Sequence, residues 1–119
     1  LETLQHIFVL SFTILNTAAN RASIRPNPKI TNDFSELRAK TLSNIKEASI
    51  ILNQYDDRKL EDLNIIFEKG GKQSKFPVWN LINGPISDAL YHTGQVVSFR
   101  RTSGNPIAKG VNVFLGIKN

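Results

Sequence analysis

The stretch that decides how this chain is interpreted is Ile86-Ser87-Asp88-Ala89-Leu90-Tyr91-His92-Thr93-Gly94-Gln95. Its pattern predicts the inward face of a helix. Asp88 and His92 are four residues apart, so on a helix one side chain lies directly above the other. This spacing suits two ligands of one metal ion, and it also suits a carboxylate that orients a histidine.

A third candidate ligand is His6, the only other histidine, which lies in a strongly apolar segment where an imidazole needs a polar partner. Two imidazoles and one carboxylate suit Zn²⁺, Ni²⁺, Fe²⁺ or Mn²⁺ and leave coordination positions open. Simpler roles stay open for two of these residues. His92 can be a core histidine bonded to a neighbouring group, and Asp88 can be an acid favoured early in a helix that restarts at Pro85.

Several neighbours of this pair are also candidates. Gln95 and Tyr91 could support the ligands or face a substrate, although ordinary packing explains each equally well. Arg100 and Arg101 could bind an anion at the helix end, or serve only as favourable cations in its last turn. Gly94 costs about 1 kcal/mol in mid-helix relative to alanine, which predicts close packing of another helix against it.

Hydrophobic spacing predicts three helical segments. Residues 3–20 form an apolar, buried helix, and residues from Asp33 or Ser35 to Tyr55 form an amphipathic one. The third runs over 77–101 and is interrupted at Gly84-Pro85, which predicts a kink or a restart.

The segments between and after these helices are less regular. Residues 21–32 carry two prolines and are interpreted as a long connection. A short hairpin or irregular excursion is expected near 62–76, with its turn at Gly70-Gly71. The apolar tail from Val111 to Leu115 is expected to pack along the body as an extended strap.

Composition limits the classes of protein that the chain can belong to. With 119 residues, 40% of them hydrophobic and 21% charged, we expect a single domain over 1–119. The absence of cysteine excludes disulfides, a thiolate nucleophile and sulfur-ligated metal. The net charge is +5, but basic residues are not interleaved with aromatic ones along one face, so a nucleic-acid partner is not expected.

Two features bear on processing and location. The chain contains no methionine, so we expect it to be N-terminally incomplete. The apolar run from Ile7 to Leu15 is much shorter than the roughly 20 residues of a membrane span, and no basic segment precedes it as in a signal peptide. No membrane association is therefore expected. A cytoplasmic location is the default expectation, although the lack of cysteine leaves the compartment open.

At His92-Thr93-Gly94-Gln95 the sequence resembles the DinB-like (damage-inducible) family of metal-dependent four-helix bundles. That family carries His-x-x-x-His-x-Gly-Gln on a late helix and one further histidine on an earlier helix. His92 and the Gly-Gln pair match the end of this motif, Asp88 stands at its first histidine, and His6 corresponds to the early one. The resemblance is most specific over roughly residues 77–107.

The resemblance implies an all-α fold, an up-down bundle that lacks its first helix in this chain, with a divalent metal held by His6, Asp88 and His92. It also implies a thiol-dependent transferase or a metal-dependent hydrolase acting on a small-molecule thiol or another small substrate. A homodimer is a separate expectation. The alternative is a non-catalytic stress-response or interaction module in which the three residues form only a hydrogen-bonded cluster. A third interpretation, a basic nucleic-acid-binding bundle, predicts salt-dependent retention on DNA, which is not expected.

Overall fold

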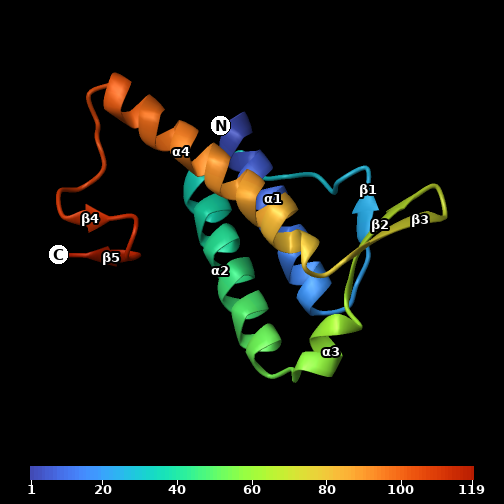
Figure 1. Cartoon of the computed structure of the whole chain (residues 1–119). Helices are drawn as coiled ribbons and strands as arrows, with labels where there is room; N and C mark the ends of the chain where they lie inside the picture. Colours follow the sequence, from blue (N-terminus) through green and yellow to red (C-terminus); the bar gives the residue numbers. More distant parts are fainter.

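The computed structural model describes residues 1–119, and three long helices form its body (Figure 1). In chain order the elements are α1 (Glu2–Ala18), β1 (Ser23–Arg25), α2 (Phe34–Asn53), α3 (Asp57–Glu61), β2 (Asn64–Lys69), β3 (Lys72–Pro77), η1 (Ile82–Ile86), α4 (Ser87–Thr102), β4 (Val111–Asn112) and β5 (Ile117–Lys118). Helix α1 is central, and both α2 and α4 pack against it. A three-stranded sheet lies on one side of the helices and the β4–β5 hairpin on the other.

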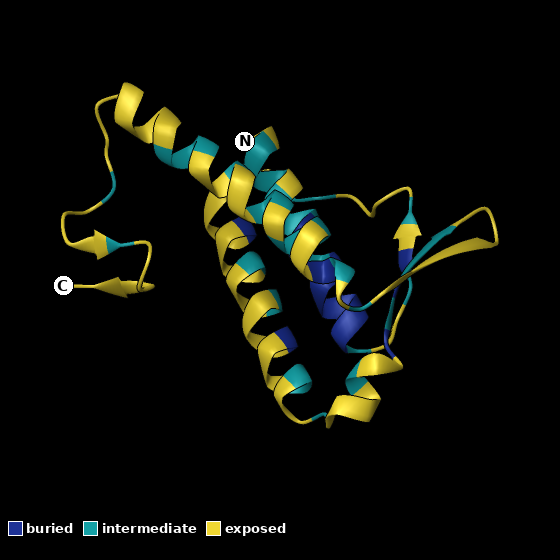
Figure 2. Cartoon of the chain, viewed as in Figure 1, coloured by how far each residue is buried: buried dark blue, intermediate teal, exposed yellow.

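The core is built around the C-terminal half of α1, which Figure 2 shows as the most buried part of the molecule. The largest cluster of buried apolar side chains comprises Ile14, Leu15, Ala18, Ala48, Ile65 and Leu81. Buried hydroxyls on α1 are satisfied locally, because Thr13 and Thr17 donate to carbonyls four residues earlier, at 3.0 and 2.9 Å. The buried helix predicted over 3–20 is therefore confirmed, although its first two turns are partly exposed.

Helix α2 starts where the sequence offers a capping side chain. Asp33 is its N-cap, and the carboxylate accepts a hydrogen bond from the backbone N–H of Glu36 at 2.7 Å. Of the two predicted starts, Asp33 and Ser35, the structure has the first. Leu37 and Ala48 are buried against α1, and the opposite side of the helix is exposed, so the amphipathic helix is confirmed.

The sheet has the order β1-β2-β3, with β1 parallel to β2 and β2 antiparallel to β3. The turn between β2 and β3 is Gly70-Gly71, with φ of +57° and +75°. A two-residue hairpin turn with positive φ at both positions favours glycine strongly. The hairpin expected near 62–76 is thus present, and it begins and ends within one or two residues of the prediction.

The predicted all-α class, and with it the up-down bundle, is wrong because the chain folds into helices and two small sheets. The strands that the sequence does not predict are β1 and the β4–β5 pair of the tail. Residues 21–32 were interpreted as a connection on account of Pro26 and Pro28. However, Ser23–Arg25 precedes both prolines and can pair with Phe67–Lys69. Pairing between such distant segments leaves no local periodicity in the sequence.

The predicted interruption at Gly84-Pro85 is confirmed. The chain kinks within η1 (Ile82–Ile86), where Gly84 has non-helical backbone angles, and α4 follows directly. Helix α4 contains no fully buried residue, so the inward face predicted for 86–95 is only partly covered. The cause is that α4 has one long helical neighbour, α1, rather than neighbours on several sides.

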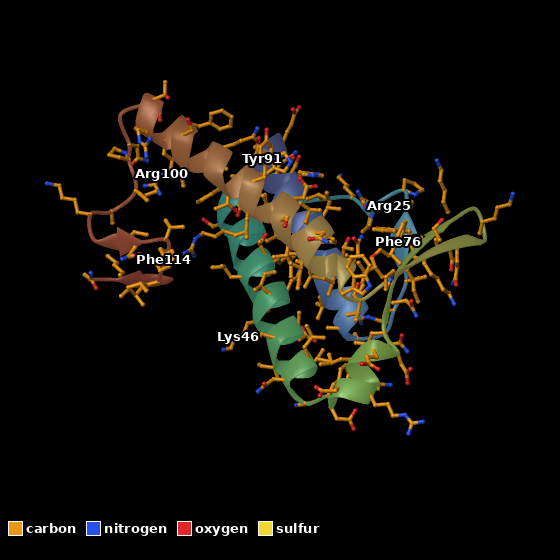
Figure 3. All side chains as sticks on the ribbon, viewed as in Figure 1. Arg25, Lys46, Phe76, Tyr91, Arg100 and Phe114 are labelled. Atoms are coloured by element: carbon orange, nitrogen blue, oxygen red, sulfur yellow. The ribbon has the colours of Figure 1, made fainter.

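The C-terminal tail does not form the predicted strap. It forms the short antiparallel pair β4–β5, which stands away from the helices (Figures 1 and 3). Phe114, between these strands, is 95% exposed. None of the helices combines the length and the apolar character needed to cross a membrane.

A groove of about 680 Å³ lies where α1, α2 and α4 meet. Ile7 and Ile14 of α1, Leu42 and Ile45 of α2, and Leu90 of α4 are among its apolar lining residues. The groove exists because α2 and α4 each pack mainly on α1.

Candidate metal centre

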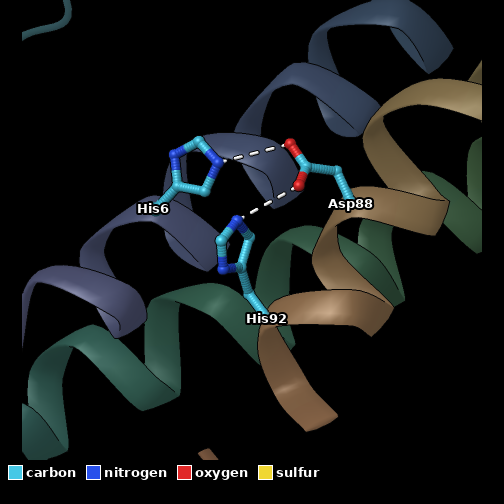
Figure 4. A group of neighbouring side chains, drawn as sticks. All are labelled: His6, Asp88 and His92. Carbon is cyan, nitrogen blue, oxygen red and sulfur yellow. Dashed lines mark hydrogen bonds and ion pairs between the residues drawn. The ribbon is translucent and has the colours of Figure 1, made fainter. Parts of the chain in front are cut away.

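The three candidate ligands meet at the crossing of α1 and α4 (Figure 4). His6 comes from the second turn of α1, whereas Asp88 and His92 lie one turn apart on α4. The Nε2 atom of His6 is 3.3 Å from Oδ2 of Asp88, and Nε2 of His92 is 3.1 Å from Oδ1. Asp88 therefore lies between the imidazoles of His6 and His92, which are 86 positions apart in the sequence (92 − 6).

The donor atoms are spaced as one small cation requires. One ligand atom from each side chain can be chosen so that all three lie within 4.8 Å of one another. Two ligands placed 2.0–2.1 Å from Zn²⁺ at the tetrahedral angle would be about 3.3 Å apart. The spacing of the donor atoms is compatible with one divalent ion of this size, and three protein ligands would leave at least one coordination position open.

The orientation of the His92 ring is set by a second residue of the same helix. Its Nδ1 atom is 2.6 Å from Oε1 of Gln95. If Nδ1–H donates to this oxygen, the neutral ring turns the lone pair of Nε2 toward the carboxylate of Asp88. Two acceptors then face each other at 3.1 Å, an arrangement that a proton or a metal cation between them would stabilise. Metal-bound histidines commonly donate their other N–H in this way.

The aromatic surroundings are sparse. The rings of His6 and His92 meet edge to face, with centroids 4.6 Å apart. The ring of Tyr91 lies 5.2 Å from that of His92, but Tyr91 is 65% exposed and projects outward from α4 (Figure 3). Tyr91 thus lies beside the cluster and is accessible to a ligand from solvent.

The two arginines at the end of α4 lie apart from this cluster. The guanidinium of Arg100 donates to the carbonyls of Asn105 and Pro106, at 3.0 and 3.2 Å. Arg100 therefore fastens the loop that follows α4. Arg101 is exposed in the last helical turn, where a cation is favourable.

The cluster is open to solvent. The side chains of His6 and Asp88 are 47% and 44% exposed, and that of His92 is 22% exposed. A small molecule could therefore reach a bound ion without any movement of the backbone. These three residues are the candidate ligands named from the sequence, and Gln95 was among the candidates to support them. The geometry adds that Gln95 contacts Nδ1 of His92.

Comparison with known proteins identified no relative of this chain. No family model, no curated protein and no solved structure matches this chain. The resemblance to DinB-like proteins therefore stays a prediction based on the residues around His92.

Proposed function

We propose that this protein binds a divalent metal ion through His6, Asp88 and His92 and presents the open coordination positions to a small molecule. The observation that supports this most directly is the convergence of two imidazoles on one carboxylate from two separate helices. The contact between His92 and Gln95 adds to it, because it turns the Nε2 atom of His92 toward the shared space.

The activity that we propose is the one that the resemblance to DinB-like proteins implies: thiol-dependent transfer or metal-dependent hydrolysis. When bound, a divalent ion would supply Lewis-acid chemistry and lower the pKa of a coordinated thiol or water. The residues of this chain have distinct tasks. Asp88 supplies the anionic ligand between the histidines, Gln95 fixes the ring of His92, and the exposed hydroxyl of Tyr91 is available to a substrate beside them.

Elemental analysis of protein purified without a histidine tag tests this proposal. We expect close to one metal ion per chain after incubation with Zn²⁺, Ni²⁺, Fe²⁺ or Mn²⁺ and removal of the excess. The double variant Asp88→Ala, His92→Ala should retain none. Glu47→Ala is the matched control, because it removes an exposed carboxylate on α2 outside the cluster and should retain the metal. Parent protein without metal under all these conditions would rule out the metal site.

A second candidate function is a non-catalytic stress-response or interaction module. One feature of the cluster favours it: the carboxylate of Asp88 already lies within 3.3 Å of a ring nitrogen of each histidine. In that case the cluster would only tie α1 to α4. Thermal unfolding separates the two functions: bound Zn²⁺ should raise the melting temperature of a metalloprotein. A melting temperature that responds neither to Zn²⁺ nor to chelator favours the module. The thiol substrate and the homodimer stay predictions.

A further inference from the structure

Three basic side chains form a row across the sheet. Arg25 of β1 pairs with Lys69 of β2, and Lys69 pairs with Lys72 of β3. Directly paired residues point to the same face of a sheet. At the usual spacing between strands the row is about 10 Å wide. Like charges placed opposite one another destabilise strand pairing, so the row does not serve the stability of the sheet.

No acidic side chain neutralises this row. The ion pairs of the structure are His6–Asp88, His92–Asp88 and Lys40–Glu36, and none of them involves the sheet. The nearest acid in sequence is Glu68. It alternates to the opposite face of β2, where its carboxylate accepts a hydrogen bond from Gln73 at 2.9 Å. Arg25 bonds to the neutral side chain of Asn27. Three positive charges therefore remain available to an anionic ligand.

Two aromatic rings lie on the same face as the row. Phe67 pairs with Ser74 and Phe76 with Ile65, so both rings share the face of Lys69. The ring centroids are 6.2 Å apart, and the guanidinium of Arg25 lies 5.3 Å from the centroid of Phe67. Phe67 packs partly against the core, whereas Phe76 is 43% exposed (Figure 3). The same face is buried in the core at Ile65 and Ser23. It is therefore open only at its outer end, which carries the row of cations, and along the edge strand β3, where Phe76 is accessible.

We propose that the open part of this face, formed by its outer end and the edge strand β3, binds single-stranded nucleic acid. The phosphates lie along Arg25, Lys69 and Lys72, and a base stacks on Phe76. Single strands present unstacked bases, and proteins recognise them by combining cationic tracks with aromatic platforms. An acidic peptide would use the charges but would gain little from the ring. No nucleic-acid partner is expected from the sequence, because basic residues are not interleaved with aromatic ones along one face. Strand pairing is what brings Arg25 onto the face of Phe67 and Lys69.

Fluorescence anisotropy with a labelled oligothymidylate, in EDTA, tests the charge row independently of the metal site. Each phosphate contact on a single strand contributes about −0.7 to the slope of log K against log salt, so three contacts predict about −2. The double variant Lys69→Gln, Lys72→Gln should reduce the slope to about −0.7 and weaken binding at least tenfold at low salt. The control Lys46→Gln, Lys75→Gln removes the same charge from α2 and from the other face of β3, and it should bind almost as the parent does.

Two further variants test the aromatic ring. Phe76→Ala should weaken binding about fivefold or more without changing the salt slope, because stacking is lost and the phosphate contacts remain. Phe114→Ala removes an even more exposed phenylalanine from the tail and should have no effect. The proposal is overturned if the oligonucleotide does not bind, or if the control lysine pair matters equally. It is also overturned if polyglutamate binds as tightly and Phe76→Ala has no effect, which would identify an acidic peptide as the ligand.

Discussion

The ring of His92 is held from both sides, by Gln95 at Nδ1 and by Asp88 at Nε2. Replacing Gln95 with leucine keeps the size of the side chain but removes the acceptor. We expect metal affinity to fall about 10- to 100-fold, because partners that orient a ligating histidine commonly contribute that much. Competition with a chromogenic chelator measures the change. Gln54→Leu, at the end of α2, is the control, and equal affinities in the two variants would show that Gln95 does not position the ring.

Gly94 was expected to allow close packing of another helix, and this prediction is wrong. A Cβ atom added at Gly94 would meet no heavy atom within 4 Å. The residue lies within α4, where glycine is less favourable than alanine by roughly 0.5–1 kcal/mol. Gly94→Ala should therefore raise the free energy of unfolding by about that amount in urea titrations. A decrease would mean that a partner molecule occupies the space beside Gly94 in solution.

At the scale of the elements, the stability of α2 depends on the capping interaction at its N-terminus. The carboxylate of Asp33 accepts the N–H of Glu36 at 2.7 Å. Asp33→Ala should lower the free energy of unfolding by about 1 kcal/mol, the usual contribution of an N-cap side chain. Ser35→Ala is the matched control, since Ser35 lies inside the helix and does not cap it. Equal losses in the two variants, measured by chemical denaturation, would contradict the assignment of Asp33 as the cap.

The same turn makes the stability of α2 depend on pH. The pKa of Glu36 is lowered from 4.5, chiefly by its hydrogen bond with Lys40, then by that with Thr31 and by the charge of Lys40. A lowered folded-state pKa contributes stability that is fully present above pH 4.5 and is lost as the pH falls through the folded value. Glu36→Gln should therefore destabilise the protein at pH 7, and the loss should shrink as the pH falls below 4.5. Glu47→Gln, in the same helix, is the control in denaturation series across this pH range.

Elements with local signals could be predicted from the sequence, and elements that depend on distant partners could not. Asp33, the apolar period of α1 and the Gly70-Gly71 turn each act within a few residues, so their effects are visible in the sequence. Strand β1 forms because it pairs with β2, and the sequence of its three residues does not predict that pairing. The exposure of α4 likewise depends on how many elements surround it. For the candidate site, the spacing of Asp88 and His92 was informative, whereas the approach of His6 was inferred from resemblance alone.

At the scale of the whole molecule, the distribution of buried residues shows which parts the fold requires. Only 14 of the 119 residues are buried, and eight of them belong to α1, so stability depends on what packs against that helix. Helices α2 and α4 and strand β2 do so. The β4–β5 hairpin instead pairs with itself and leaves Val113, Phe114 and Leu115 exposed. The tail should therefore be dispensable for folding.

Removing residues 109–119 tests this directly, because the truncation leaves the bonds from Arg100 to Asn105 and Pro106 intact. The free energy of unfolding should change by no more than about 0.5 kcal/mol, as for other exposed positions. Ile65→Ala provides the contrast, since loss of a fully buried core side chain should cost about 2–5 kcal/mol. If the truncation lowers the free energy of unfolding as much as Ile65→Ala does, then the tail covers apolar surface in solution. The apolar groove among α1, α2 and α4 is the surface that it would cover.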